Sequence, residues 1–281
     1  MGKQKRSENT YQKINTIFMR DAKNVIMPYE PFVKPEFEYL RNNKWRGEEK
    51  INGTNMRIEV KARIEYQIEI VNNIEYEETD IPVGVHFDVR IAGKTDNAQI
   101  PKNLLKHMQE KYPDDKVLAA LGLKEFIPVE EWAEHKWNSY EDIPNIYTIY
   151  GEGYGEGIQS GGWYIKGGNE FIVFDVKVNN LYLKTEARDD IATKLGAPIV
   201  PFKGYFTLDE AIDYVRKGFR SEVAENPEAK MAEGLVLRTD LGLCDRMGER
   251  LIVKIKYEDF QKYRAVYGTD DKVEQQRNDH Y

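Results

Sequence analysis

The chain has 281 residues, of which 41% are hydrophobic and 32% charged, a composition typical of a folded, water-soluble protein with a substantial core. Its formal net charge of −7 excludes nucleic-acid binding through an overall positive field, so any such binding requires a local basic groove. A single cysteine, Cys244, excludes an internal disulfide and a cysteine-based zinc site, and no apolar run approaches the ~20 residues of a membrane helix.

The first predicted elements are a basic N-terminal segment and a long alternating run. Residues 1–13 lack the apolar stretch of a secretory signal, so we expect a cytoplasmic protein. Apolar residues alternate strictly from Met56 to Ile70, which predicts a strand with one apolar face. Because the run is longer than a typical strand, we expect a bend or a hairpin within it, and Asn72-Asn73 has the composition of a hairpin turn.

Helix and strand patterns alternate irregularly along the rest of the chain. Two short helices broken at Pro113 are predicted in 102–122, and 130–137 is a candidate for a third. Later helices are predicted at 185–196, ended by Gly196, and after the capping box that begins at Thr207. Strands are predicted at 145–152, 170–178, 232–239 and 250–257. Because these strands are not spaced as regular βαβ units, the predicted fold class is α+β, with antiparallel sheets flanked by helices.

Four familiar sequence signatures are excluded, by wrong spacing or by absence. The Gly-Lys-Thr at 93–95 is not a phosphate-binding loop, because Asp88 stands where the loop requires its first glycine. The glycine-rich run 151–157 has neither the GxGxxG spacing nor a βαβ context. The four histidines show no HExxH spacing, and no GxSxG sequence occurs.

A set of short motifs occurs in a fixed order: EKINGTN at 49–55, YGEG at 150–153, FDVKV at 174–178, AEGLVLR at 232–238 and VKIK at 253–256. Each motif is weak alone. Together they resemble the covalent nucleotidyltransferase superfamily of ATP-dependent ligases and capping enzymes. The Lys-Ile-x-Gly-Thr-Asn form of the first motif is similar to that of RNA ligases of the nick-sealing type, and the resemblance runs from about residue 11 to residue 264.

The resemblance implies a nucleotidyltransferase core of the ATP-grasp-like kind in residues 1–265, with a helical insertion near 102–142 and a polar, frayed tail at 266–281. Only 25 residues follow Lys256, too few for the oligonucleotide-binding-fold domain of DNA ligases and capping enzymes, which favours RNA as the substrate. Residues 93–101 resemble a segment of viral members, so we expect a viral or phage-type enzyme that acts in the host cytoplasm.

The same resemblance assigns the nucleophile to Lys50, which attacks the α-phosphorus of ATP and becomes lysyl-AMP. An amine must be neutral to attack, and nearby cations and partial burial favour the neutral form. Lys254 and Lys256 lie two apart on a predicted strand and therefore share one face, from which they would stabilise charge on a triphosphate. Gly53 is expected to let the backbone approach phosphate without a Cβ in the way.

Further roles are carried over residue by residue. Glu233 is expected to bind Mg²⁺ or Mn²⁺, because phosphoryl transfer between anions requires a cation and a carboxylate suits one. The implied ATP- and AMP-binding residues are Glu49, Lys50, Thr54, Asn55, Glu152, Phe174, Lys254 and Lys256. The implied 5′-phosphate-binding residues are Lys94, Arg90, Asn55 and Asp175. Without the resemblance, Phe174 would be core packing, Glu152 a solvated strand end and Glu233 a turn residue.

The implied function is ATP-dependent RNA ligation. Lys50 takes AMP from ATP, AMP passes to an RNA 5′-phosphate, and a 3′-hydroxyl then displaces it. We expect a monomer that acts on such RNA ends, with an end-healing kinase or phosphatase as a partner. Lys94 stands where viral members have arginine, which weakens end binding, since lysine offers a point charge and no bidentate fork. Two alternatives stay open, a minimal DNA or polynucleotide ligase and a non-catalytic RNA- or nucleotide-binding protein with this fold.

Overall fold

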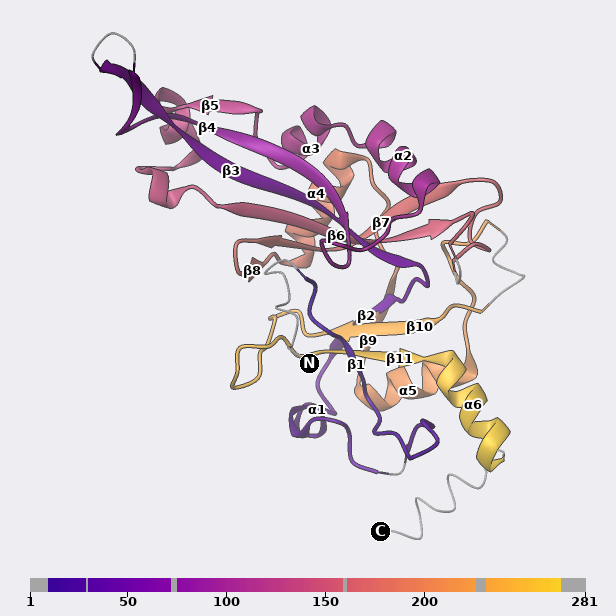
Figure 1. The fold of residues 1–281 in the computed structure, drawn as a ribbon. Helices are drawn as coiled ribbons and strands as arrows, with labels where there is room; N and C mark the ends of the chain where they lie inside the picture. The colour runs from indigo at the N-terminus through magenta and orange to yellow at the C-terminus, as the bar shows by residue number, and fades with distance from the viewer. Residues whose placement is uncertain (1–9, 29, 72–74, 159–160, 226–230, 269–281) are drawn as a thin grey trace. The chain divides into compact units, whose positions relative to one another are not determined.

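The computed structural model describes residues 10–28, 30–71, 75–158, 161–225 and 231–268. The chain divides into two compact units, each built on one β-sheet. Unit 1 contains Met1–Tyr11, Gly53–Gly162 and Gly167–Ile199, and unit 2 contains Gln12–Asn52, Trp163–Lys166 and Val200–Tyr281. Both sheets carry helices (Figure 1), so the predicted α+β class is confirmed. In the described ranges, no helix has the length and apolarity needed to cross a membrane.

Unit 1 is a six-stranded antiparallel sheet in the order β5-β4-β3-β6-β7-β8. Its strands are β3 (Thr54–Val71), β4 (Glu75–Gly93), β5 (Phe126–Pro128), β6 (Ile146–Gly155), β7 (Asn169–Val178) and β8 (Leu181–Tyr182). Its helices are α2 (Lys102–Lys111), α3 (Asp114–Ala120) and α4 (Thr185–Leu195), with 3₁₀ turns η1 (Val129–His135) and η2 (Tyr140–Asp142). The helix break at Pro113 and the helix end at Gly196, which has a positive φ of 70°, are as predicted.

The long alternating run is one strand, β3, with 18 residues. No hairpin occurs within it; instead, its pairing with β4 shifts register between Glu65 and Tyr66 and again before Ile68. Such bulges absorb the bend that a strand of this length requires. The predicted turn at Asn72-Asn73 lies outside the described residues. The inward face of β3 packs under the helices, with Met56, Ile58 and Val60 almost fully buried in the core of unit 1.

Unit 2 is a five-stranded sheet in the order β1-β11-β10-β2-β9, antiparallel except for the short parallel pair β1 and β11. Its elements are β1 (Asn15–Thr16), α1 (Pro35–Tyr39), β2 (Trp45–Glu49), β9 (Phe202–Phe206), α5 (Leu208–Lys217), β10 (Gly234–Arg238), β11 (Ile252–Lys256) and α6 (Tyr257–Tyr267). The capping box at Thr207 is formed as predicted. Helices α1, α5 and α6 lie on one side of the sheet (Figure 1) and share a core with it.

Side chains of β11 point alternately into the core of unit 2 and to the opposite face of the sheet. Val253 and Ile255 are buried in the core, whereas Lys254 and Lys256 remain partly exposed on the opposite face. The prediction that these two lysines share a face is therefore confirmed. The division of the chain at residue 265 stays a prediction.

Gly234 provides a test of how this sheet is held together. Its φ is +150°, and a Cβ there would overlap the carbonyl oxygen of Ile255 on β11. Gly234→Ala should therefore lower the free energy of unfolding by about 2–4 kcal/mol, measured by urea denaturation. Gly242→Ala is the matched control, because that glycine also has a positive φ, of +63°, but faces open space; it should cost only about 1 kcal/mol. Equal losses in the two variants would contradict this explanation.

Candidate active site

Lys50 immediately follows the last residue of β2, in unit 2. Its backbone N–H donates to the carbonyl of Gly234 at 2.9 Å, which continues the antiparallel pairing of β2 with β10. Its side chain is 20% exposed, and the Nζ lies 2.8 Å from Oε2 of Glu233. The lysine is therefore anchored by the sheet and is held by a carboxylate.

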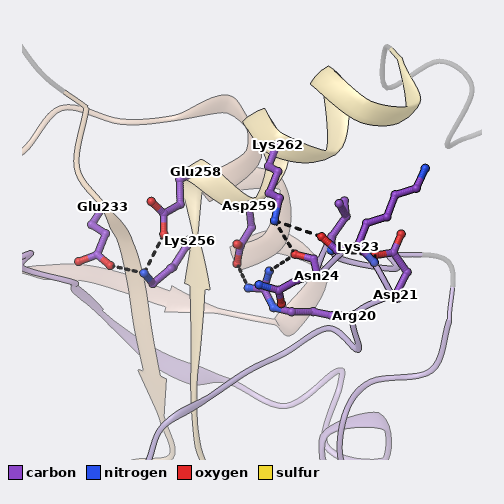
Figure 2. Close-up of polar contacts among 10 residues, drawn as sticks. Arg20, Asp21, Lys23, Asn24, Glu233, Lys256, Glu258, Asp259 and Lys262 are labelled. Carbon is purple, nitrogen blue, oxygen red and sulfur yellow. Dashed lines mark hydrogen bonds and ion pairs between the residues drawn. The ribbon is translucent and has the colours of Figure 1, made fainter.

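Glu233 immediately precedes β10 and bridges two lysines. Oε1 of Glu233 lies 2.8 Å from the Nζ of Lys256, while Oε2 contacts Lys50 at the same distance. The sheet register explains the meeting, because Gly234 pairs with Lys256 on β11 and receives the Lys50 N–H from the other side. Figure 2 shows Lys256 between Glu233 and Glu258, which it also contacts at 2.8 Å. Burial tends to lower the pKa of Lys256, but these two carboxylates outweigh it and raise the pKa.

Lys254 is in a different electrostatic environment. Within the described ranges it forms no ion pair, although it lies near two other lysines. Burial lowers the pKa of Lys254, and the charges of Lys50 and Lys256 lower it further, with Glu233 opposing them. Three lysines beside two carboxylates, Glu233 and Glu258, therefore leave an excess of positive charge at one end of the unit 2 sheet.

Glu49, next to the candidate nucleophile, is almost fully buried. Its carboxylate accepts hydrogen bonds from the hydroxyl of Ser221 and, at 3.0 Å, from the backbone N–H of Glu222. Burial raises the pKa of Glu49, and these two hydrogen bonds oppose the rise. Glu49 thus fixes the segment that begins at Ser221. The sequence carries no signal for Ser221, since an isolated serine is not a motif.

Thr54 and Asn55 begin β3 of unit 1 and pair with Gly153 and Glu152 on β6. The structure requires glycine at position 53, just before them, because a Cβ there would overlap the carbonyl oxygen of Gly153. The close approach of two strands thus requires this glycine, while the approach to phosphate stays a prediction. The side-chain oxygen of Asn55 is buried without a hydrogen-bond partner among the residues that the structure describes.

Phe174 is a bulge on β7. Tyr150 pairs with Asp175, but the next residue of β6 pairs with Val173, which leaves Phe174 without a partner residue on β6. The Phe174 ring meets Tyr11 edge-on with centroids 5.0 Å apart, and the Tyr11 hydroxyl donates to the buried carboxylate of Asp175 at 2.7 Å. No local pattern indicates that Tyr11 joins these two residues, because it lies 164 positions from Asp175.

Arg90 and Lys94 lie on unit 1 at the end of β4 and in the loop after it. Arg90 contacts Glu59 at 2.9 Å and Asp96 at 2.5 Å, whereas Lys94 is exposed. Arg57, which the sequence did not single out, is fully buried and contacts the same two acids at 2.8 and 2.5 Å. The loop that carries Lys94 is thus fixed to the sheet by two arginines through Asp96.

The predicted site residues therefore form two groups. Unit 2 brings together Lys50, Glu233, Lys254 and Lys256, and it also carries Glu49, whose carboxylate is bound to Ser221 and Glu222. Unit 1 carries Thr54, Asn55, Arg90, Lys94, Glu152, Phe174 and Asp175. The roles assigned to these residues stay predictions.

Comparison with known proteins extends this picture. A family model described as RNA ligase matches residues 43–256. Among solved structures, the chain is similar to a mutant RNA ligase from Naegleria gruberi with ATP and Mn, with a TM-score of 0.50 and 15% identity over 91% of this chain and 58% of that chain. It is also similar to the Naegleria gruberi RNA ligase with PPi, with a TM-score of 0.48 and 14% identity over 92% of this chain and 64% of that chain. No curated protein matches the sequence.

At such identities the first of these likenesses supports the fold alone, an α+β architecture of antiparallel sheets flanked by helices. This chain spans less than two thirds of the length of the Naegleria ligases that it resembles. The family model, in contrast, covers well over half of the chain and includes Lys50, Glu233 and the lysines of β11. The chain therefore belongs to the RNA ligase family.

Proposed function

We propose that this protein is an ATP-dependent RNA ligase that carries AMP on Lys50. The observation that supports this best is the contact of Lys50 with Glu233, 2.8 Å long, in a cluster with Lys254 and Lys256. A solvated surface lysine would not have a side chain only 20% exposed that shares a buried carboxylate with a second lysine. Membership of the RNA ligase family supplies the reaction class that fits this arrangement.

In the first step the lone pair of Lys50 Nζ attacks the α-phosphorus of ATP. An N–P bond forms, the bond from the α-phosphorus to the bridging oxygen breaks, and pyrophosphate leaves with its electrons. Before the attack, the Lys50 ammonium must lose a proton to solvent, and its ion pair with Glu233 must break. Lys254 and Lys256 lie beside it, where their charges offset the negative charge that develops on the phosphates.

Glu233 is the candidate ligand for a divalent cation. The described residues contain no group of three or more His, Cys, Asp or Glu side chains that could hold a metal ion. Glu233 contributes one carboxylate between Lys50 and Lys256, which fits Mg²⁺ or Mn²⁺ bound mainly through substrate phosphates. Such a cation would neutralise phosphate charge, and the Naegleria gruberi ligase was solved with ATP and Mn. A Glu233 carboxylate shared with the cation would hold Lys50 less tightly.

In the later steps an oxygen of the RNA 5′-phosphate attacks the phosphorus of lysyl-AMP and breaks the N–P bond. The 3′-hydroxyl then attacks the 5′-phosphorus and AMP leaves. We assign the adenosine contacts to Glu152 and Phe174, and the 5′-phosphate contacts to Arg90 and Lys94. The buried, unpartnered side-chain oxygen of Asn55 supports a ligand at the start of β3. RNA ends of this kind would come from an end-healing kinase or phosphatase.

Substitution of Lys50 tests the nucleophile. Wild type with radiolabelled ATP and Mg²⁺ should yield an acid-labile protein–AMP adduct that survives denaturant. Lys50→Ala should reduce the label to background, and so should Lys50→Arg, because a guanidinium stays protonated and is a poor nucleophile. Lys44→Ala, which removes an exposed lysine from the same unit, should label normally. Labelled Lys50→Ala would show that the nucleophile is another residue, and an unlabelled wild type would exclude the ligase function.

Variants of the two glutamates that contact Lys256 can distinguish a catalytic role from simple ion pairing. Glu233 contacts both Lys50 and Lys256, whereas Glu258 contacts Lys256 and is exposed. Glu233→Gln should slow adenylylation by about 10²–10³-fold and raise the Mg²⁺ concentration that half-saturates the reaction. Glu258→Gln should change both quantities by less than about threefold. Similar losses in the two variants, measured by single-turnover labelling, would show that the charge of Lys256 alone matters.

Lys254 should destabilise the fold while serving catalysis. Its lowered pKa means that the charged form is disfavoured by burial and by Lys50 and Lys256. The destabilisation is complete below the lowered pKa and fades as pH rises from there towards the ordinary value of 10.5. Lys254→Met should therefore raise the Tm by a few degrees at pH 7, with a smaller gain at high pH, and slow adenylylation at least about tenfold.

The control for Lys254→Met is Lys217→Met, which changes an exposed lysine on α5. That variant should show neither the pH-dependent gain in Tm nor the slower adenylylation. A lower Tm for Lys254→Met at pH 7 would contradict the electrostatic reasoning.

RNA specificity needs its own comparison. Sealing of a nicked RNA duplex should exceed sealing of the same nick in DNA, measured with one 5′-labelled strand in gel assays. Equal rates would favour the general polynucleotide ligase.

A further inference from the structure

A groove of about 990 Å³ opens on unit 2 between the segment around β1 and the start of α6. We call it the basic groove, because five of its lining side chains are cationic and two are acidic: Lys13, Arg20, Lys254, Lys256 and Lys262, with Glu258 and Asp259. All of them belong to unit 2. A hollow with this excess of cations is unusual in a chain whose net charge is −7.

Two of the five cations are neutralised within the fold. Arg20 contacts Asp259 at 2.7 Å, which fastens the N-terminal segment to α6. Lys256 lies between Glu233 and Glu258 (Figure 2). The acidic side chains of the groove are thus already occupied by these two partners, and they leave the remaining cations uncompensated.

The other three cations, Lys13, Lys254 and Lys262, have no carboxylate partner in the described part of the chain. Figure 2 shows Lys262 directed at Asn24, whose backbone carbonyl accepts its hydrogen bond at 2.9 Å. A carbonyl is neutral, so this contact orients the ammonium without cancelling its charge. Lys13 and Lys262 are both exposed, which leaves their charges accessible to a ligand.

The extent of the groove favours a chain of phosphates over a single diphosphate. Lys256 directly precedes α6 and Lys262 is its sixth residue, so the two are separated by roughly 9 Å along the helix. Lys13, on the N-terminal segment, lines the same hollow. Cations spread over two separate segments suit a backbone with regularly spaced charges, the arrangement with which proteins follow a single strand of nucleic acid.

We propose that the basic groove binds the phosphodiester backbone of the RNA substrate, with Lys13 and Lys262 as phosphate contacts outside the chemical centre. The inference rests on the proposed RNA ligase function. It also explains how an acidic protein holds RNA, since binding depends on local uncompensated lysines and not on the overall field. Lys254 lines the groove and lies near Lys50, so RNA bound there would pass close to the adenylylated lysine.

The test uses full-length protein and a fluorescent, 5′-phosphorylated single-stranded RNA without ATP, followed by anisotropy over a range of NaCl concentrations. Lys13→Ala combined with Lys262→Ala should weaken binding about tenfold at 0.1 M salt and reduce the slope of log K against log salt by about 1.4, since each phosphate contact contributes about 0.7. Lys13→Glu alone leaves the contact of Lys262 with Asn24 intact and should weaken binding at least as much as Lys13→Ala.

The matched control is Lys44→Ala combined with Lys217→Ala, which removes two exposed lysines of unit 2 from outside the groove. This control changes the net charge equally and should retain the affinity and salt slope of the wild type. Unchanged RNA binding in both the Lys13/Lys262 variant and Lys13→Glu would overturn the proposal.

A second measurement distinguishes RNA from the phosphates of ATP. Both groove variants should form the protein–AMP adduct with wild-type rate and KM for ATP, while single-turnover ligation of RNA by the adenylylated enzyme falls at subsaturating RNA. A raised KM for ATP with unchanged RNA binding would assign the groove to the triphosphate and overturn the proposal. Failure of the ligase function itself would be seen separately, as a wild type that binds RNA but takes no label from ATP.

Discussion

The carboxylate of Glu233 is the interaction on which the candidate active site depends. It holds Lys50 with one oxygen and Lys256 with the other, each at 2.8 Å, and it is only 6% exposed. The three residues come from three neighbouring strands, and antiparallel pairing fixes their ends at a common level. Any change in the register of β10 would separate the carboxylate from both lysines at once. Gly234 lies against the backbone of Ile255, so it helps to fix the register on which the contacts of Glu233 depend.

Positive charge is concentrated in unit 2 at some expense to stability. Lys254 is partly buried beside two other cations, and its lowered pKa reflects that environment. A site designed for stability alone would have an apolar residue there, because a desolvated amine without a partner is unfavourable. An anionic ligand would relieve the repulsion. The lysines of the basic groove are in a similar position. Lys262 donates to a neutral backbone carbonyl, and Lys13 has no carboxylate partner among the described residues, so both charges remain available to an anionic ligand.

Unit 1 uses its charges differently. Arg57 and Arg90 are both satisfied by Glu59 and Asp96, so they rigidify the end of β4 and the loop after it. Lys94, exposed on this fixed loop, adds a point charge beside the partly exposed Arg90, as expected of phosphate contacts that position a nucleic acid without reading its sequence. The aromatic pair of Tyr11 and Phe174 is likewise held in place, through the hydrogen bond of Tyr11 to Asp175.

The sequence by itself determined the element types, because periodicity and caps are local properties. The strands that carry Phe174 and Lys254, the capping box at Thr207 and the break at Pro113 all follow from neighbouring residues, whereas no local pattern predicted the strand β2 before Lys50. The order of the short motifs likewise predicted the family, which the match over 43–256 confirms. The alternating run was read correctly as strand, but its continuity as one strand depends on bulges paired against β4, which no local pattern encodes.

Tertiary structure alone decided which partners these residues have. Lys50 and Glu233 are 183 positions apart, and only the register of β2, β10 and β11 places them in contact. The burial of Glu49 against Ser221 and the overlap that demands Gly53 arise in the same way, from strands and loops distant in sequence. Local sequence favours the backbone conformation of each segment. The ion pairs and hydrogen bonds of the site depend instead on which distant segments the tertiary fold brings into contact.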